Sequence, residues 1–335
     1  MQNSEIFAKE VFCFESVGNK ISSAFFAKKL HHAIILVGPK STGKASFAKD
    51  LAIELLKSSP KDGNNGAENN FVNTNQHPDL KIIVAEGLSN TIKVNQIRGE
   101  GGDKDDSLIY FLNQTPSIAS CKFAIIDAID EANINASNSL LKTLEEPLPN
   151  NFLILIAHNE SKILATIKSR CLLIRMPIID SETFLKTLSL KRPNINRKDL
   201  DLLKEITANA LGEAIENYQE YPKIYSYLIE DLVAGIISAK LLEKTTNKDF
   251  NLDNVAKLVN FLFSRMLLFY ECNSKLIKFN SYQQEILLFV KISSRQNLQQ
   301  IFANISKINK IFVDTKRLNL DRRLAVINIF NLINS

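Results

Sequence analysis

The first half of the chain alternates between short, continuous apolar runs and segments in which apolar residues recur every three or four positions. Short runs rich in β-branched residues predict strands buried on both faces, and the longer periodic segments predict helices. Strand and helix in repetition imply right-handed crossovers and a parallel sheet covered on both sides. The predicted strands are 33–37, 80–84, 122–126, 151–157 and 171–175, and the two clearest helices are 44–57 and 134–146.

Beyond residue 177 the strand pattern stops and only helical spacing remains. We therefore expect an α/β domain with a parallel sheet over residues 1–178, a small helical domain over 179–220 and a helical bundle over 221–335. The apolar faces of the bundle serve a folded core or, in the alternative, an oligomerisation surface. The predicted helices are 181–190, 197–209, 211–219, 223–244, 252–270, 281–290, 296–310 and 321–333.

Composition narrows the class of protein only modestly. The 335 residues carry 41 Lys and Arg against 36 Asp and Glu, and a net charge of +5 neither requires nor excludes nucleic acid. Cys13, Cys121, Cys171 and Cys272 lie far apart, which excludes a local disulfide framework or thiolate zinc site and favours a reducing, cytoplasmic location. The stretch 58–78 is rich in Asn, Gly and Ser and predicts a long connection.

A phosphate-binding loop is predicted between the first strand and the helix after it. The sequence GPKSTGK places Gly38, Gly43 and Lys44 at GxxxxGK spacing. In such a loop, backbone amides surround the phosphates and the lysine reaches the outer ones. The next residue is normally Ser or Thr, whose hydroxyl ligates magnesium, but here it is Ala45. Ser46 lies about 100° further round the helix and cannot substitute for it.

The acidic half of a nucleotide site is similarly incomplete. Asp127 ends an apolar strand, where it would hold a magnesium-bound water or, alternatively, cap the strand. A hydrolysing enzyme needs a glutamate next, and this chain has Ala128, while Asp130 and Glu131 should point elsewhere. We expect a degenerate nucleotide site in a chain that requires no cofactor and has no ATPase activity; binding of ATP or magnesium is left open.

Several segments, in this order and spacing, resemble the bacterial clamp-loader subunits of the AAA+ class, and the delta-prime members of DNA polymerase III fit best. The likeness covers most of the first 178 residues, with a further match near the C-terminus. The segments are HAIILVGPKSTGKA at 32–45, HPD at 77–79, IKVNQIR at 92–98, NSLLKTLEEP at 138–147, TIKSRC at 166–171 and NLDRRLA at 319–325.

The resemblance implies an ATPase-like α/β domain, a three-helix lid and a helical collar that joins five subunits. It also implies a rigid stator that supports ATP-dependent loading of the sliding clamp onto primed DNA during replication. Its partners would be the delta and tau/gamma subunits, with clamp and DNA reached through the complex, and no membrane. The chain would belong to a DNA polymerase holoenzyme without itself having polymerase or ATPase activity. The alternative is an active ATPase motor of the tau/gamma type.

Within the resemblance, Arg170 of the SRC motif is the expected catalytic residue. In the family this arginine reaches the γ-phosphate of a neighbour's ATP, where a guanidinium raises the rate by roughly 10³ to 10⁵. Ser169 and Cys171 are expected to position the turn, with Cys171 buried and inert. Spacing alone favours an ordinary surface arginine at this position, and the TIKSRC motif reverses that preference.

Two sensor positions follow from the same likeness. Asn159 lies where the first phosphate sensor sits, although His158 or Ser161 could occupy that position. Glu213 stands where the second sensor would supply a cation, which argues further against nucleotide turnover.

Other residues of the shared motifs keep two interpretations each. Glu145 and Glu146 precede a proline at a helix end, where their role is structural or catalytic. Lys93 and Arg98 contact DNA phosphates or are solvated surface charges. Many relatives carry a four-cysteine zinc module where this chain has 58–78; that stretch contains no cysteine, so we predict no metal.

Overall fold

The computed structural model describes residues 14–61, 77–85, 91–99, 107–246, 252–271 and 283–334. Most of the predicted connection 58–78 lies outside these residues, as do Cys13 and Cys272. The chain divides into two compact units. The first contains residues 1–183 and 210–212, and the second contains 184–209 and 213–335.

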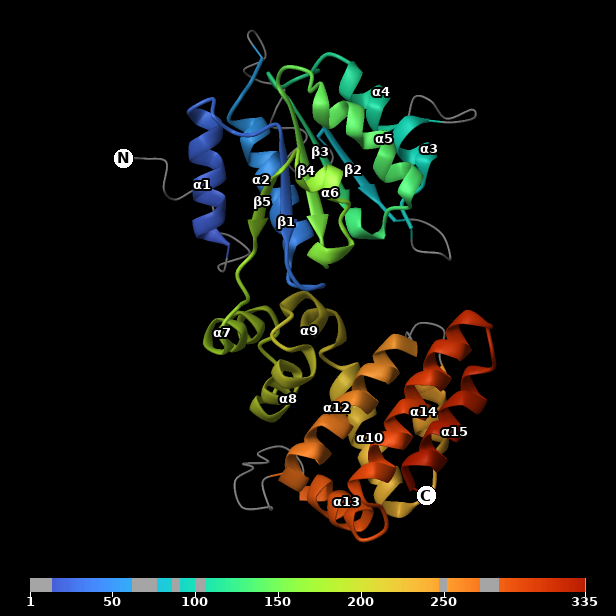
Figure 1. Cartoon of the computed structure of the whole chain (residues 1–335). Helices are drawn as coiled ribbons and strands as arrows, with labels where there is room; N and C mark the ends of the chain where they lie inside the picture. The colour runs from blue at the N-terminus through green and yellow to red at the C-terminus, as the bar shows by residue number, and fades with distance from the viewer. Residues whose placement is uncertain are drawn as a thin grey trace. The chain divides into compact units, whose positions relative to one another are not determined.

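The first unit is built on a five-stranded parallel sheet, in the order β2-β3-β4-β1-β5 (Figure 1). Strand β1 lies between β4 and β5, so that Val37 at its end pairs with Ala157 and with Arg175. This confirms the predicted α/β class and brings the ends of β1, β3 and β4 to one edge of the sheet. The strands are Ala33–Val37 (β1), Leu80–Val84 (β2), Lys122–Asp127 (β3), Asn151–Ala157 (β4) and Leu172–Arg175 (β5).

Helices cover both faces of the sheet (Figure 1), because alternate residues of each strand point to opposite sides. Ile34 and Leu36 of β1 pack on one side with α1 and α2, and Ile35 on the other with α3 to α6. Helices α1, α4 and α6 were not predicted as separate elements. The helices are Glu15–Phe26 (α1), Lys44–Lys57 (α2), Val94–Arg98 (α3), Leu108–Asn113 (α4), Ile134–Glu145 (α5) and Ala165–Lys168 (α6), with short 3₁₀ turns at Ile129–Glu131 (η3) and Glu160–Lys162 (η4).

The HPD segment holds the sheet together rather than contributing to a site. Asp79 is fully buried, and its carboxylate accepts the backbone N–H groups of three successive residues, Ser117 (2.6 Å), Ile118 (2.8 Å) and Ala119 (2.8 Å). His77 Nδ1 accepts the Asp79 N–H at 3.1 Å. The start of β2 is thereby tied to the segment that leads into β3.

The second unit is helical throughout its described residues. The predicted single helix 223–244 was wrong: the chain turns at Gly235, whose φ of +74° lies in the region that favours glycine, and two helices result. Whether residues 179–220 form a lid distinct from a collar stays a prediction. The helices from residue 181 on are Ser181–Lys191 (α7), Arg197–Thr207 (α8), Leu211–Asn217 (α9), Glu220–Ala234 (α10), Ala239–Thr246 (α11), Leu252–Glu271 (α12), Gln283–Ser293 (α13), Leu298–Arg317 (α14) and Arg322–Asn334 (α15).

A buried ionic cluster joins four helices of this unit. Arg265 of α12 is 9% exposed and donates from Nε (3.1 Å) and one terminal nitrogen (2.7 Å) to Glu285 of α13, which is fully buried. Tyr225 of α10 donates its hydroxyl to the same carboxylate at 2.6 Å, and the other terminal nitrogen of Arg265 pairs with Glu205 of α8. The buried charge of Glu285 is therefore neutralised by Arg265 and hydrogen-bonded between the helices.

Candidate nucleotide site and arginine turn

The predicted phosphate loop connects β1 to α2 as expected. Gly43, at φ +94°, is the residue before the helix, and Lys44 begins it. Lys44 is only 2% exposed, and its ammonium donates to the carbonyl of Pro39 at 2.5 Å. The hydroxyl of Thr42 donates to the same carbonyl at 3.0 Å. The lysine that would reach a phosphate is thus hydrogen-bonded to a carbonyl of its own loop.

Charges from three strand ends meet around Lys44. Burial lowers the pKa of Lys44 to about 8, although Asp127 and Asp130 oppose this shift. Burial also raises the pKa of Asp127, against the influence of His158 and Lys44. The pKa of His158 is lowered, first by burial and then by Lys44. The structure therefore brings together Lys44, Asp127 and His158, of which sequence analysis had linked the first two.

Asp130 has a positioning role that sequence analysis missed. Its two carboxylate oxygens accept the backbone N–H groups of His158 (3.0 Å) and Asn159 (2.9 Å) and so fix the chain after β4. The predicted sensor Asn159 uses its side-chain oxygen locally, accepting the N–H (3.0 Å) and the hydroxyl (2.7 Å) of Ser161. Glu131 instead pairs with Lys40 of the loop at 3.2 Å.

The residues at this edge fit an anion better than a magnesium ion. The loop, the start of α2 and a lysine are those of a phosphate site. The position after Lys44 carries the methyl group of Ala45, and Asp127 is followed by Ala128, so neither the metal-ligating hydroxyl nor the activating carboxylate is supplied. Among the described residues, no cluster of three or more His, Cys, Asp or Glu side chains has an arrangement suited to a metal ion.

Glu213, at the expected second-sensor position, is used in packing. Its carboxylate accepts the Tyr221 hydroxyl at 2.7 Å and pairs with the Lys257 ammonium at 2.5 Å. These partners lie on α10 and α12 of the second unit. The second-sensor position therefore carries a carboxylate that is engaged by Tyr221 and Lys257, and it offers no positive charge to a phosphate.

Arg170 lies in a short turn between α6 and β5. One terminal nitrogen of its guanidinium donates to the Thr166 carbonyl (3.0 Å) and to the Ser169 hydroxyl (3.1 Å), and the other pairs with Glu145 at 2.6 Å. Its side chain remains 34% exposed. The partnership with Glu145 was missed, because 25 residues separate the pair in the sequence.

Cys171, next in the turn, was predicted to be buried, and this was wrong: it is half-buried and packs against the core on the α5 side of the sheet. Burial raises the pKa of its thiol to about 12, so the thiolate is scarce at neutral pH and the expectation of an inert cysteine is supported.

The two predicted DNA-facing cations lie at the ends of one short helix. Lys93 precedes α3 and Arg98 is its last residue, and both are exposed.

Glu146, which follows α5, lines a pocket with Lys142 and Pro147. No described helix has the length and apolar character needed to cross a bilayer.

Comparison with known proteins identifies the family to which the α/β part of the chain belongs. Residues 14–180 match the family model described as "DNA polymerase III, delta subunit". DNA polymerase III subunit delta' of Pseudomonas aeruginosa is 30% identical over 187 residues, 55% of this chain and 54% of that protein. Subunit delta' of Bacillus subtilis is 33% identical over 145 residues, 43% of this chain and 41% of that protein.

Other relatives carry different subunit names. Subunit tau of Bacillus subtilis is 25% identical over 262 residues, 75% of this chain and 45% of that protein. Among solved structures, a DNA polymerase III gamma subunit-related protein of Thermotoga maritima aligns with a TM-score of 0.47 and 19% identity, covering 96% of this chain and 98% of that one. The chain spans about half the length of the curated relatives it matches. Residues 14–180 belong to the bacterial DNA polymerase III clamp-loader family of delta', gamma and tau subunits.

Proposed function

We propose that the chain is a delta-prime-type stator of a bacterial clamp loader. It lends Arg170 to the ATP bound by a neighbouring subunit and does not hydrolyse ATP itself. The observation that carries the proposal is the contrast between an arginine that is ordered but a third exposed and a nucleotide edge that lacks its metal-ligating hydroxyl and its activating acid. The delta' relatives and the family model support the same choice.

The chemistry of Arg170 follows from its charge and its exposure. A guanidinium stays protonated at any physiological pH and can form two parallel hydrogen bonds to phosphate oxygens. Placed across a subunit boundary, it neutralises the charge that develops on the transferred phosphoryl group. The chain's own Lys44 serves no such purpose in this scheme, so no bound nucleotide or magnesium is required.

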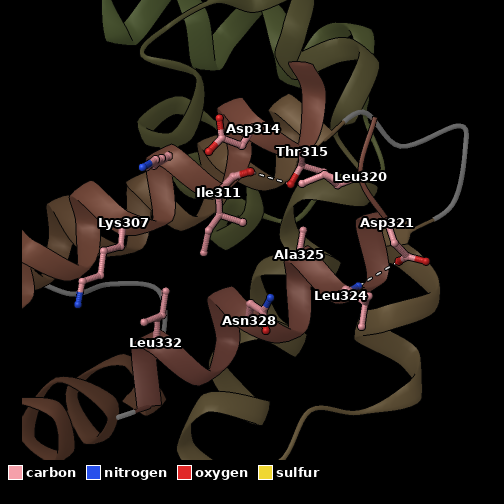
Figure 2. Close-up of a pocket in the computed structure, with 11 residues that line it drawn as sticks. Lys307, Ile311, Asp314, Thr315, Leu320, Asp321, Leu324, Ala325, Asn328 and Leu332 are labelled. Carbon is pink, nitrogen blue, oxygen red and sulfur yellow. Dashed lines mark hydrogen bonds between the residues drawn. The ribbon is translucent and has the colours of Figure 1, made fainter. Parts of the chain in front are cut away.

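The helices over residues 221–335 would act as the collar, joining delta and tau/gamma subunits, with clamp and primed DNA reached through the complex. A pocket of about 630 Å³ between α14 and α15 supports this part of the proposal (Figure 2). Leu320 and Leu324, which line it, are 50% and 61% exposed. Leu324→Glu should weaken co-purification with the other subunits, whereas Leu190→Glu, at an equally exposed leucine of α7, should not.

Reconstitution of the complete loader tests the arginine assignment. Arg170→Ala should leave assembly intact and slow ATP hydrolysis in the presence of clamp and primed DNA. The matched control is Arg175→Ala: Arg175 is also exposed and also pairs with a glutamate, Glu160, at 2.9 Å. Equal rates for the wild type and the Arg170 variant would refute the finger.

The second candidate is an ATP-hydrolysing motor of the tau/gamma type. Similarity to tau over 75% of the chain and the preserved loop around Lys44 favour it. Steady-state ATP turnover by the isolated chain, abolished by Lys44→Ala, would establish the motor and exclude the stator.

A further inference from the structure

The guanidinium of Arg170 is held by acceptors from two separate elements. Thr166 lies in α6 and Ser169 directly follows that helix, whereas Glu145 is the last residue of α5. Arginine has five N–H donors, and the hydrogen bonds to Thr166 and Ser169 use two of them, both on one terminal nitrogen. The other terminal nitrogen forms the ion pair with Glu145, and the remaining donors are available to a phosphate oxygen. The side chain is therefore ordered without being fully occupied.

The two elements cannot easily shift with respect to one another. Ile167 of α6 is fully buried and Leu144 of α5 is 2% exposed, and both belong to the same core cluster. Each lies within three residues of one member of the ion pair, so core packing fixes the backbone positions from which the side chains of Glu145 and Arg170 extend. A carboxylate at the end of α5 then determines where the arginine in the turn after α6 points.

We propose that Glu145 is the positioning residue for Arg170, and this rests on the proposed role of Arg170 as a finger. The carboxylate keeps the long side chain from sampling its many rotamers, so that its remaining N–H groups face a neighbour's γ-phosphate before that phosphate arrives. The LEEP motif then acts together with the SRC motif, because its Glu145 orients Arg170.

Exposure separates this role from a structural one. Glu145 is 50% exposed and Arg170 34%, and an ion pair this accessible to water contributes little to folding. Glu145→Gln keeps the size of the side chain and removes its charge. Its unfolding midpoint should match that of the wild type, so a change in hydrolysis cannot be attributed to loss of fold.

The experiment compares variants in the reconstituted loader with clamp and primed DNA. Glu145→Gln should lower kcat for ATP by about two- to fivefold, the factor that corresponds to an exposed ion pair, with KM unchanged. Glu146→Gln is the matched control, because Glu146 is the adjacent exposed glutamate and lines a different pocket; it should have no effect. In an Arg170→Ala background, Glu145→Gln should cause no additional loss.

Each other outcome has one meaning. If Arg170→Ala slows hydrolysis but Glu145→Gln does not, the positioning role is wrong and the finger stands. If Glu145→Gln slows hydrolysis equally in the Arg170→Ala background, Glu145 acts independently and the proposal is overturned. If Arg170→Ala has no effect, the proposed function itself fails and the positioning role fails with it.

Discussion

Lys44 and Arg170 belong to the same α/β unit, but the first cation is buried and the second is partly exposed to solvent. Lys44 is 2% exposed, bonds to a carbonyl of its own loop and has its pKa lowered to about 8 by burial. Arg170 is a third exposed, is held by two hydrogen bonds and an ion pair, and retains donors for another molecule. The comparison indicates which cation has become part of the fold and which remains available to a partner.

The largest expected difference between the two is in catalysis by the reconstituted loader. Arg170→Ala should slow hydrolysis at the neighbouring site by roughly 10³-fold, because charge on the transferred phosphoryl loses its partner. Lys44→Ala should leave the rate unchanged, because Lys44 faces a site without the residues for hydrolysis. Single-turnover measurements with clamp and primed DNA would decide, and a larger loss for the Lys44 variant would reverse the comparison.

Arg265 sharpens the comparison by showing an arginine that is wholly structural. Arg265→Ala would leave the fully buried Glu285 without its cation, and we expect a loss of about 3–5 kcal/mol in the free energy of unfolding. Arg265→Met combined with Glu285→Leu removes both charges and should recover part of this loss. Urea denaturation followed by circular dichroism measures both variants. A stability close to wild type for Arg265→Ala would show that the cluster contributes little.

The smallest expected effect concerns pH. The pKa of Lys44 is about 8 in the folded chain against 10.5 ordinarily, so between these values the unfolded chain binds a proton that the folded chain does not. Stability relative to Lys44→Met should therefore rise with pH, by on the order of 2 kcal/mol between pH 8 and 10, and level off below about pH 7.

Arg170→Met is the control for that measurement, since arginine does not titrate in this range. Its stability difference from wild type should stay flat between pH 7 and 10 and within about 0.5 kcal/mol of zero. A flat profile for Lys44→Met as well would mean that Lys44 is better solvated than its 2% exposure indicates.

Much of the fold could be predicted because periodicity reports burial directly. The ranges 33–37, 44–57, 80–84 and 151–157 were predicted to the residue, since each is a strand of mostly apolar residues or a regular amphipathic helix. The helix predicted over 223–244 was wrong because the periodic spacing continues across Gly235, where only the left-handed backbone of one residue ends the first helix. Short helices such as α3 and α6 contain too few residues for a period to emerge.

The candidate site was predictable only where a motif is local. Lys44 and Asp127 each follow or end a recognisable strand, and Arg170 lies in a short motif. The bond from Asp130 to the chain after β4 and the pairing of Glu145 with Arg170 join residues 25 or more positions apart. Such contacts depend on how strands are ordered and how helices pack, which spacing along one chain does not encode.

The carboxylate of Asp79 has a consequence for how this unit can vary. By accepting three successive N–H groups it closes a loop of about 40 residues, as a cross-link would. The entropy of loop closure grows only slowly with loop length, so adding residues between the two anchored ends makes that closure little harder. The connections that separate β2, α3 and α4 within this stretch can therefore change in length while β2 keeps its place beside β3.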